Sequence, residues 1–360
     1  MRAAVFRNGQ IMVDTMAEPT PGPGQVLVKL LACGICGTDL NARLHAGKMV
    51  EMSQFLPWRK PMDLTRDVVF GHEYCCEILD YGRNCTKALK QGTRVVSVPR
   101  IIVDGRVEGI GYSNDNVGGY AERMLLSEQL LIPVPSHVTS ALASLTEPLS
   151  IGIHALAKAS LVGDEVPLVI GCGPIGLAVV AALKGKGFGP IIAADYSAKR
   201  RELAVRLGAD IAVDPAANSS FETWEEHARL SPAEIAKLPF SLIPATPTKP
   251  CVIFECVGMP GVIQSILEDA PQNAHVVVVG VCMQADQQKP MLASYKELTT
   301  QYVLASTPDE FAQSLTLISS GKIDIGAMIT GKVGLDEVAT AFDELASPNR
   351  HAKIVVEPWR

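Results

Sequence analysis

The chain has 360 residues, of which 48% are hydrophobic and 19% are charged. This length suits two domains with a sizeable core, and the composition excludes a mainly disordered protein. The net charge of −6 gives no basic field for nucleic acid or an anionic membrane, so a small-molecule partner is expected. Because the N-terminal apolar run is too short for a signal peptide and no segment approaches the ~18 apolar residues of a membrane span, we expect a cytoplasmic protein.

The first part of the chain shows short strands interrupted by Gly and Pro, a pattern that indicates an irregular β-barrel. Strands are expected at 26–32, 68–70, 77–79, 92–98 and 119–122. From about residue 151 strands alternate with helices, which predicts a doubly wound parallel sheet. Its strands are expected at 168–170, 191–194, 211–213, 252–254 and 276–279, and its helices at 177–184, 199–207 and 262–267.

The end of the chain returns to mixed structure and finishes on a strand at 352–356 with no helix after it. We therefore expect one domain to contain residues 1–150 and 298–360 and the other to contain 151–297. The proline-rich segment 214–251, with a short helix expected at 231–238, is interpreted as a surface insertion.

A glycine-rich motif follows the apolar run before residue 171. It contains Gly171, Gly173, Pro174, Ile175 and Gly176. The glycines permit a tight turn and let the backbone approach a pyrophosphate, and the N-terminus of the following helix attracts the phosphate charge. The flanking strand and helix make this a strong indication of a dinucleotide site.

An acidic residue, Asp195, follows the second expected strand of this domain. A carboxylate at this spacing accepts hydrogen bonds from the ribose hydroxyls and repels a 2′-phosphate, which favours NAD over NADP. Arg200 is expected either to cover the adenine face or to be a solvated helix charge.

A thiol, an imidazole and a carboxylate occur on three separate segments, at Cys36, His72 and Glu147. Such groups can close around one Zn²⁺ and leave a fourth position open, as catalytic zinc sites require. A lone histidine is more often structural, but His72 stands in a Gly-His-Glu sequence. An alternative redox pair of Cys33 and Cys36 is disfavoured, because these residues do not open the helix of a thioredoxin-like unit.

Together these residues resemble the zinc-dependent medium-chain dehydrogenase family, whose members oxidise alcohols, polyols and amino alcohols with NAD(P). The likeness runs along nearly the whole chain. It includes Cys36-Gly37-Thr38-Asp39, Gly71-His72-Glu73, Gly118-Gly119-Tyr120-Ala121-Glu122, Glu147-Pro148-Leu149-Ser150 and the nucleotide motif. Glu147-Pro148 is similar to the sorbitol and threonine dehydrogenase branch, where a glutamate takes the third ligand position.

The resemblance implies a GroES-like irregular β-barrel catalytic domain, a Rossmann nucleotide domain, and Cys36, His72 and Glu147 as zinc ligands. Glu73 is interpreted either as a residue that contacts the zinc ligands without binding the metal, or as a ligand that alternates with another one. Asp39 is expected to accept a hydrogen bond from the other nitrogen of His72, and Thr38 to take the proton of the alcohol.

Two departures from the family pattern have consequences. Many members hold a structural zinc with four cysteines before the Gly-Gly-Tyr-Ala sequence, but residues 99–116 contain no cysteine, so one zinc per chain is expected. Where many relatives have a proton-relaying histidine, this chain has Asn41. Because an amide cannot titrate, the proton must leave by another route, through Thr38 or with His45 as an alternative.

The sequence thus predicts an NAD-dependent zinc dehydrogenase that acts on an alcohol or polyol, or on the matching carbonyl, and forms a homodimer or homotetramer. Two alternatives remain. One is a zinc-free quinone or enoyl reductase of the same superfamily, which lacks the ligand set. The other is a non-catalytic dinucleotide-binding protein, because fold does not dictate function.

Overall fold

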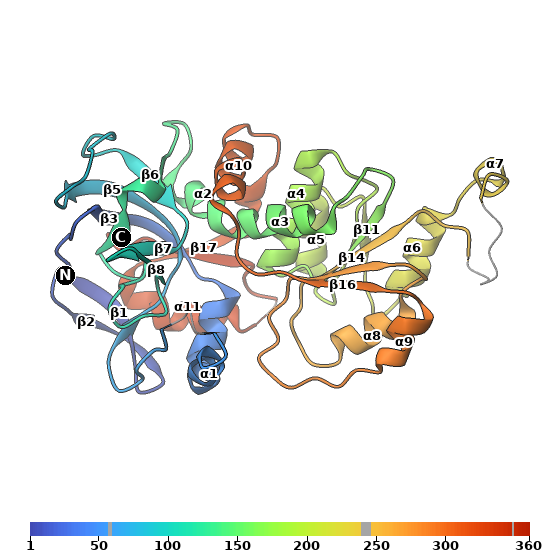
Figure 1. Ribbon diagram of the computed structural model, residues 1–360, viewed down its shortest axis with the longest axis horizontal. Coiled ribbons are helices and arrows are strands. Elements are labelled where there is room, and N and C mark those ends of the chain that lie inside the picture. The colour runs from blue at the N-terminus through green and yellow to red at the C-terminus, as the bar shows by residue number, and fades with distance from the viewer. Residues whose placement is uncertain (57–59, 239–245, 348) are drawn as a thin grey trace. The chain divides into compact units, whose positions relative to one another are not determined.

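The computed structural model describes residues 1–56, 60–238, 246–347 and 349–360 (Figure 1). It consists of two compact units. Unit 1 contains Met1–Ser150, Thr307–Gly321 and Met328–Arg360, and unit 2 contains Ile151–Ser306 and Lys322–Ala327. The return to unit 1 therefore comes later than the expected residue 298.

Unit 1 is built mainly from β-strands. Its larger sheet has the order β10-β6-β5-β3-β18-β17, with β9 also paired to β3, and a smaller sheet has the order β2-β1-β4. The strands are β1 (Arg2–Arg7), β2 (Gln10–Thr15), β3 (Gln25–Gly34), β4 (Val68–Val69), β5 (Glu73–Tyr81), β6 (Arg94–Ser97), β7 (Arg100–Val103), β8 (Arg106–Gly109), β9 (Arg123–Ser127), β10 (Leu131–Pro133), β17 (Ile329–Val333) and β18 (Lys353–Val356).

The central strand of this sheet is β3, whose Val26, Val28 and Leu30 are fully buried. Alternate residues of a strand share one face, so this spacing supplies an apolar inner face to the sheet. Among the described residues, the α-helices that lie wholly or partly in unit 1 are α1 (Gly37–Ser53), α2 (Ser140–Ser144), α3 (Thr146–Ala159), α10 (Pro308–Ser319) and α11 (Val338–Leu345).

Unit 2 contains the expected parallel sheet, with helices between its strands. The strand order is β13-β12-β11-β14-β15-β16, so the chain runs outward from β11 in one direction and then continues on its other side. The strands are β11 (Val166–Ile170), β12 (Ile192–Ala194), β13 (Ile211–Val213), β14 (Cys251–Glu255), β15 (His275–Val278) and β16 (Thr299–Tyr302). The carboxyl ends of β11 and β14 form the switch point at which such sheets bind nucleotides.

The helices of unit 2 follow its strands in sequence. They are α4 (Pro174–Lys186), α5 (Ala198–Leu207), α6 (Ser220–Ala228), α7 (Pro232–Ile235), α8 (Val262–Asp269) and α9 (Pro290–Tyr295). The helix α6 lies in the segment interpreted as an insertion, yet its Trp224 is buried in the core and donates to the Val166 carbonyl at 2.8 Å. Among the described residues of that segment, only those after α6 are therefore outside the sheet-and-helix pattern, and its residues 239–245 lie outside the described part of the chain.

Two other expected elements differ from the structure. Residues 119–122 form no strand: they contribute a single bridge between Ala3 and Ala121, and β9 begins at Arg123. Residues 298–306 belong to unit 2, because β16 pairs in parallel with β15 and extends that sheet. The partner of Ala121 lies far along the chain, whereas β16 pairs with the strand that precedes it.

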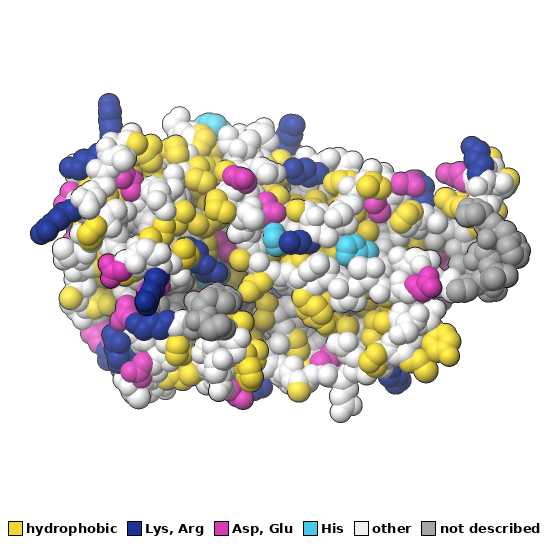
Figure 2. Space-filling model, in the orientation of Figure 1, with side chains coloured by type: hydrophobic (Ala, Val, Ile, Leu, Met, Phe, Trp, Pro, Cys, Tyr) yellow, Lys and Arg dark blue, Asp and Glu magenta, His cyan; other side chains and the backbone are white. Residues whose placement is uncertain are grey.

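The surface carries mixed charge. Lys and Arg side chains are interspersed with Asp and Glu over the face that Figure 2 shows. Among the described residues, no helix is long and apolar enough to cross a membrane.

Candidate metal and nucleotide sites

Cys36 occupies the N-cap position of α1, directly after the end of β3. Its sulfur accepts from the backbone N–H of Thr38 at 3.5 Å. In return, Asp39 at the third helical position accepts from the backbone N–H of Cys36 at 3.0 Å. Burial and the charge of Glu73 raise the pKa of Cys36, whereas His72, Lys353 and the dipole of the helix N-terminus favour the negatively charged sulfur that ligates a metal.

His72 and Glu73 lie where β5 begins, next to the end of β3. The register pairs Glu73 with Gly34, so the Gly-His-Glu sequence is placed beside the strand that leads to Cys36. A Cβ atom at Gly34 would lie 2.1 Å from Oε2 of Glu73. Glycine is therefore required at residue 34 to make room for this carboxylate.

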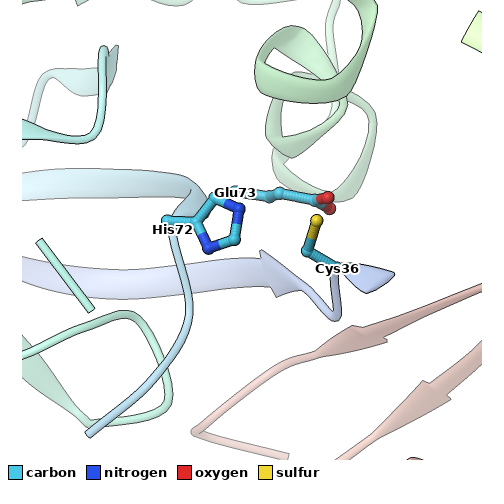
Figure 3. A group of neighbouring side chains, drawn as sticks. All are labelled: Cys36, His72 and Glu73. Carbon is cyan, nitrogen blue, oxygen red and sulfur yellow. The ribbon is translucent and has the colours of Figure 1, made fainter. Parts of the chain in front are cut away.

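Cys36, His72 and Glu73 form a buried group whose ligand atoms all lie within 4.8 Å of one another. Figure 3 shows the Glu73 carboxylate beside the Cys36 sulfur, with the His72 ring next to them. Thiolate sulfur, imidazole nitrogen and carboxylate oxygen are the donors that zinc takes in proteins, and the group fits that metal. Among the described residues, it is the one cluster of this kind.

Glu73 is also paired with a lysine. Nζ of Lys353, on β18, lies 2.7 Å from both carboxylate oxygens and donates to the Ile35 carbonyl at 3.0 Å. Both side chains of the pair are fully buried. The sequence analysis did not find Lys353, because it stands 280 residues after Glu73 in an ordinary strand pattern.

Glu147, the third expected ligand, lies in the first turn of α3 and is not a member of the compact group. Its carboxyl is buried, and its Oε2 has no hydrogen-bond partner among the described residues. Burial raises the pKa of Glu147 to about 7, the charge of His72 opposes this shift, and the charge of Glu73 adds to it. An unpartnered buried carboxyl oxygen costs free energy unless a cation or a donor meets it.

Asp39 lies behind His72, as the sequence predicts, but a tyrosine stands between them. Oδ1 of Asp39 is 3.5 Å from Nδ1 of His72. The Tyr112 hydroxyl is closer to both groups, at 3.2 Å from Nδ1 and 2.7 Å from Oδ1. Tyr120 donates to the other oxygen, Oδ2, at 2.6 Å. Tyr112 was missed by the sequence analysis, which considered residues 99–116 only for cysteines.

Both candidates for the proton route, Thr38 and His45, lie on α1, as does Asn41. Thr38 is in its first turn and Asn41 follows, both half-buried. His45 has non-helical backbone angles, with φ −132° and ψ 31°, and marks a kink in the helix. The cysteine-free segment 99–116 forms the hairpin of β7 and β8 and the loop that carries Tyr112.

The nucleotide motif forms the turn from β11 into α4. Gly173 is the N-cap of α4 and Pro174 its first residue, a position that suits the fixed φ of proline. A Cβ at Gly176 would lie 1.8 Å from the Gly171 carbonyl oxygen, so only glycine allows this approach of helix and strand. The motif residues Gly171, Gly173, Pro174, Ile175 and Gly176 therefore form one turn between β11 and the first residues of α4, where the sequence predicts such a turn.

Asp195 follows β12 and lies beside this turn. Its Oδ2 accepts from the backbone N–H of Cys172 at 2.8 Å, and its Oδ1 accepts from that of Ser197 at 2.7 Å. NH1 of Arg200 is 3.8 Å from Oδ2, and the buried Nε of Arg200 has no partner among the described residues. Asp195 and Arg200 are therefore adjacent, next to the helix N-terminus that would hold a phosphate.

A buried S, N and O ligand group in one unit and a dinucleotide motif in the other define a metal-containing oxidoreductase. Two family models match the chain: the alcohol dehydrogenase GroES-like domain at residues 22–136 and the zinc-binding dehydrogenase at residues 174–320. The chain is 30% identical to (R,R)-butanediol dehydrogenase of Bacillus subtilis strain 168 over 371 residues, 99% of this chain and 100% of that protein.

Two further comparisons agree. Sorbitol dehydrogenase of Bacillus subtilis strain 168 is 26% identical, over 100% of this chain and 98% of that protein. The crystal structure of 2R,3R-butanediol dehydrogenase from Bacillus subtilis matches with a TM-score of 0.79 and 28% identity, over 99% of both chains. The chain belongs to the zinc-binding medium-chain dehydrogenase family, the family of alcohol and polyol dehydrogenases.

Removing the partner of Glu73 should destabilise unit 1. Lys353→Met leaves a buried carboxylate without its cation, which costs about 3–5 kcal/mol of unfolding free energy. Lys332→Met is the matched control, because its pair with Glu357 is at the same 2.7 Å but Lys332 is 44% exposed. The control should change stability by less than about 1 kcal/mol.

Urea unfolding followed by tryptophan fluorescence measures both variants. The double variant Glu73→Leu/Lys353→Met, which removes both charges, should recover much of the loss. Equal losses in Lys353→Met and Lys332→Met would show that the buried pair has no special role.

Proposed function

We propose that this protein is an NAD-dependent zinc dehydrogenase of an alcohol or polyol. The observation that supports it most is the buried group of Cys36, His72 and Glu73. The buried Glu147 carboxyl interacts electrostatically with His72 and Glu73, and its Oε2 has no hydrogen-bond partner among the described residues. Zinc, when bound, polarises the oxygen of an alcohol and lowers its pKa, so that the carbon-bound hydrogen leaves as hydride to the nicotinamide.

Cys36, His72 and Glu147 are proposed as the protein ligands. Glu73 is already neutralised by Lys353, so one thiolate and one further carboxylate balance the charge of a zinc ion. A zinc ligand at Glu147 would satisfy its unpartnered oxygen. Glu73 then does not bind the metal, and it can become a ligand only if its ion pair with Lys353 breaks.

The chain must also remove a proton from the substrate alcohol. We propose that the Thr38 hydroxyl, in the first turn of α1 beside Cys36, receives it and hands it on to water or a ribose hydroxyl. Thr38→Ala should lower kcat about 10²-fold or more and His45→Ala less than about tenfold. Steady-state kinetics giving the reverse order would assign the route to His45.

We also propose a homodimer or homotetramer. The strand β16 is the edge of the unit 2 sheet, its four residues are exposed, and its unpaired backbone groups could continue the sheet into a second copy. Light scattering that shows a monomer at micromolar concentration would reject this assembly.

The alternatives make different predictions. A zinc-free quinone or enoyl reductase would keep its activity in the presence of a chelator. A non-catalytic dinucleotide-binding protein would bind NAD without turnover. The relatives named for butanediol and sorbitol suggest vicinal diols and polyols as the first substrates to test. Reduction of NAD at 340 nm that is lost with a chelator and restored by zinc would support the proposed function; activity that survives complete metal removal would not.

The ligand assignment can be tested by elemental analysis of the desalted protein. The wild type should hold one zinc per chain, since residues 99–116 contain no cysteine for a second. Glu147→Gln should lose most of the zinc, because an amide oxygen is a weaker ligand without charge. The expected reduction in zinc affinity is about 10-fold or more.

The matched control for this change is Glu73→Gln/Lys353→Met, which removes the other carboxylate together with its cation. If Glu147 is the ligand, this double variant keeps its zinc. Retention of zinc by Glu147→Gln and its loss from the double variant would assign the third ligand to Glu73 instead.

The preference for NAD should depend on Asp195. Its carboxylate repels a 2′-phosphate, so kcat/KM with NADP should be at least about tenfold lower than with NAD, and Asp195→Ala should narrow the difference. Arg200→Gln is the informative control, since this neighbouring cation could instead attract the phosphate. A wild type that prefers NADP, with the preference lost in Arg200→Gln, would show that Arg200 determines the cofactor.

A further inference from the structure

Tyr112 stands between a metal-ligand histidine and the carboxylate behind it. Its hydroxyl lies 3.2 Å from Nδ1 of His72 and 2.7 Å from Oδ1 of Asp39, whereas these two atoms are 3.5 Å from each other. The rings of Tyr112 and His72 are also in contact, with centroids 5.4 Å apart. The shorter connection between His72 and Asp39 therefore runs through the tyrosine hydroxyl.

The loop that carries Tyr112 is fixed in place on both sides. A Cβ at Gly111 would lie 3.0 Å from the Gly71 carbonyl oxygen, so the loop backbone approaches the residue just before His72. On the other side, the Asn114 amide donates to the carbonyls of Asp63 and Asp67 at 2.9 and 3.2 Å. The chain on both sides of Tyr112 is thus held against the segment that leads to His72.

The direction of the hydrogen bonds that Tyr112 makes with Asp39 and His72 follows from which of these groups carries a proton. The Tyr112 hydroxyl carries one proton, which it donates to Oδ1 of Asp39 at 2.7 Å. The Asp39 carboxylate accepts from the hydroxyls of Tyr112 and Tyr120 and from the backbone N–H of Cys36, and it has no proton to donate. Tyr112 therefore donates to Asp39, and its oxygen is left to accept a proton from Nδ1 of His72.

We infer that Tyr112 is a positioning residue of the metal site, which holds His72 in its Nδ1–H form and thereby presents Nε2 to the metal. A ligating histidine usually donates its other N–H to a carboxylate, carbonyl or water, and here a neutral hydroxyl takes that place. Because a phenol accepts less strongly than a carboxylate, it also limits how much negative charge reaches the ring. This inference rests on the proposed zinc site.

The tyrosine pair around Asp39 provides a matched comparison. Tyr120 donates to Oδ2 of Asp39 at 2.6 Å, so Tyr120→Phe removes a similar hydrogen bond from the same carboxylate while leaving the Tyr112 contact with His72 in place. If Tyr112 acts on His72 directly, Tyr112→Phe should lower zinc affinity about 10-fold or more. Tyr120→Phe should lower it less than about threefold.

Competition with a chelator of known zinc affinity measures both variants. Equal losses in the two variants would show that Tyr112 acts only through Asp39, and no loss in Tyr112→Phe would show that it does not act; either result overturns the inference. Failure of the wild type to bind zinc would instead reject the proposed function.

A second measurement needs no variant. In the zinc-loaded wild type, the ¹⁵N shifts of His72 should show a protonated Nδ1 and a metal-bound Nε2. Cobalt in place of zinc should give a shifted, slowly exchanging Nδ1–H signal, and this signal should exchange faster in Tyr112→Phe than in Tyr120→Phe. Metal bound through Nδ1 would overturn the inference even if Tyr112→Phe did not fold.

Discussion

The ion pair of Lys353 and Glu73 is the constraint on which the metal site depends. Two fully buried charges are stable only if each is fully satisfied, and Lys353 meets this condition with both oxygens of Glu73 and the Ile35 carbonyl. The pair joins β18 to β5 across the end of β3, next to the residues that lead to Cys36. The last strand of the chain thereby fixes the place where the Gly-His-Glu sequence begins.

This pair also determines the electrostatics of the ligand group. With Cys36 and Glu147 as the proposed ligands, a Glu73 carboxylate without Lys353 would add a third negative charge, and the site would carry a net negative charge with a divalent metal. With Lys353 present, the lysine cancels Glu73, and the two remaining anions match the metal. A nearly neutral buried site avoids the large cost of an uncompensated charge at low dielectric.

Most of the fold could be predicted from the sequence, because the parallel sheet and the glycine motif are local patterns. Gly171 to Gly176 and Asp195 lie within one strand-helix-strand unit, so spacing alone indicates their arrangement. The metal site could be predicted only in part. Lys353 and Tyr112 reach it from β18 and from an irregular loop, and no short-range pattern shows such contacts. Residues 298–306 were expected in the other domain for a different reason: Thr299–Tyr302 are exposed and mostly polar, so they do not show the apolar pattern of a strand in a parallel sheet, although β16 pairs with β15.

This difference follows from how the two sites are built. The nucleotide site needs one turn and the start of one helix, so its residues are constrained by backbone geometry and by the absence of a Cβ, as at Gly176. The group of Cys36, His72 and Glu73 comes from the N-cap of α1 and the start of β5, and the side chains that contact it come from α1, β18 and the loop of Tyr112. A substitution far from the ligands, in the loop of Tyr112 or in β18, can therefore change metal binding while the nucleotide motif remains intact. We therefore expect that such a substitution weakens metal binding and leaves nucleotide binding unchanged.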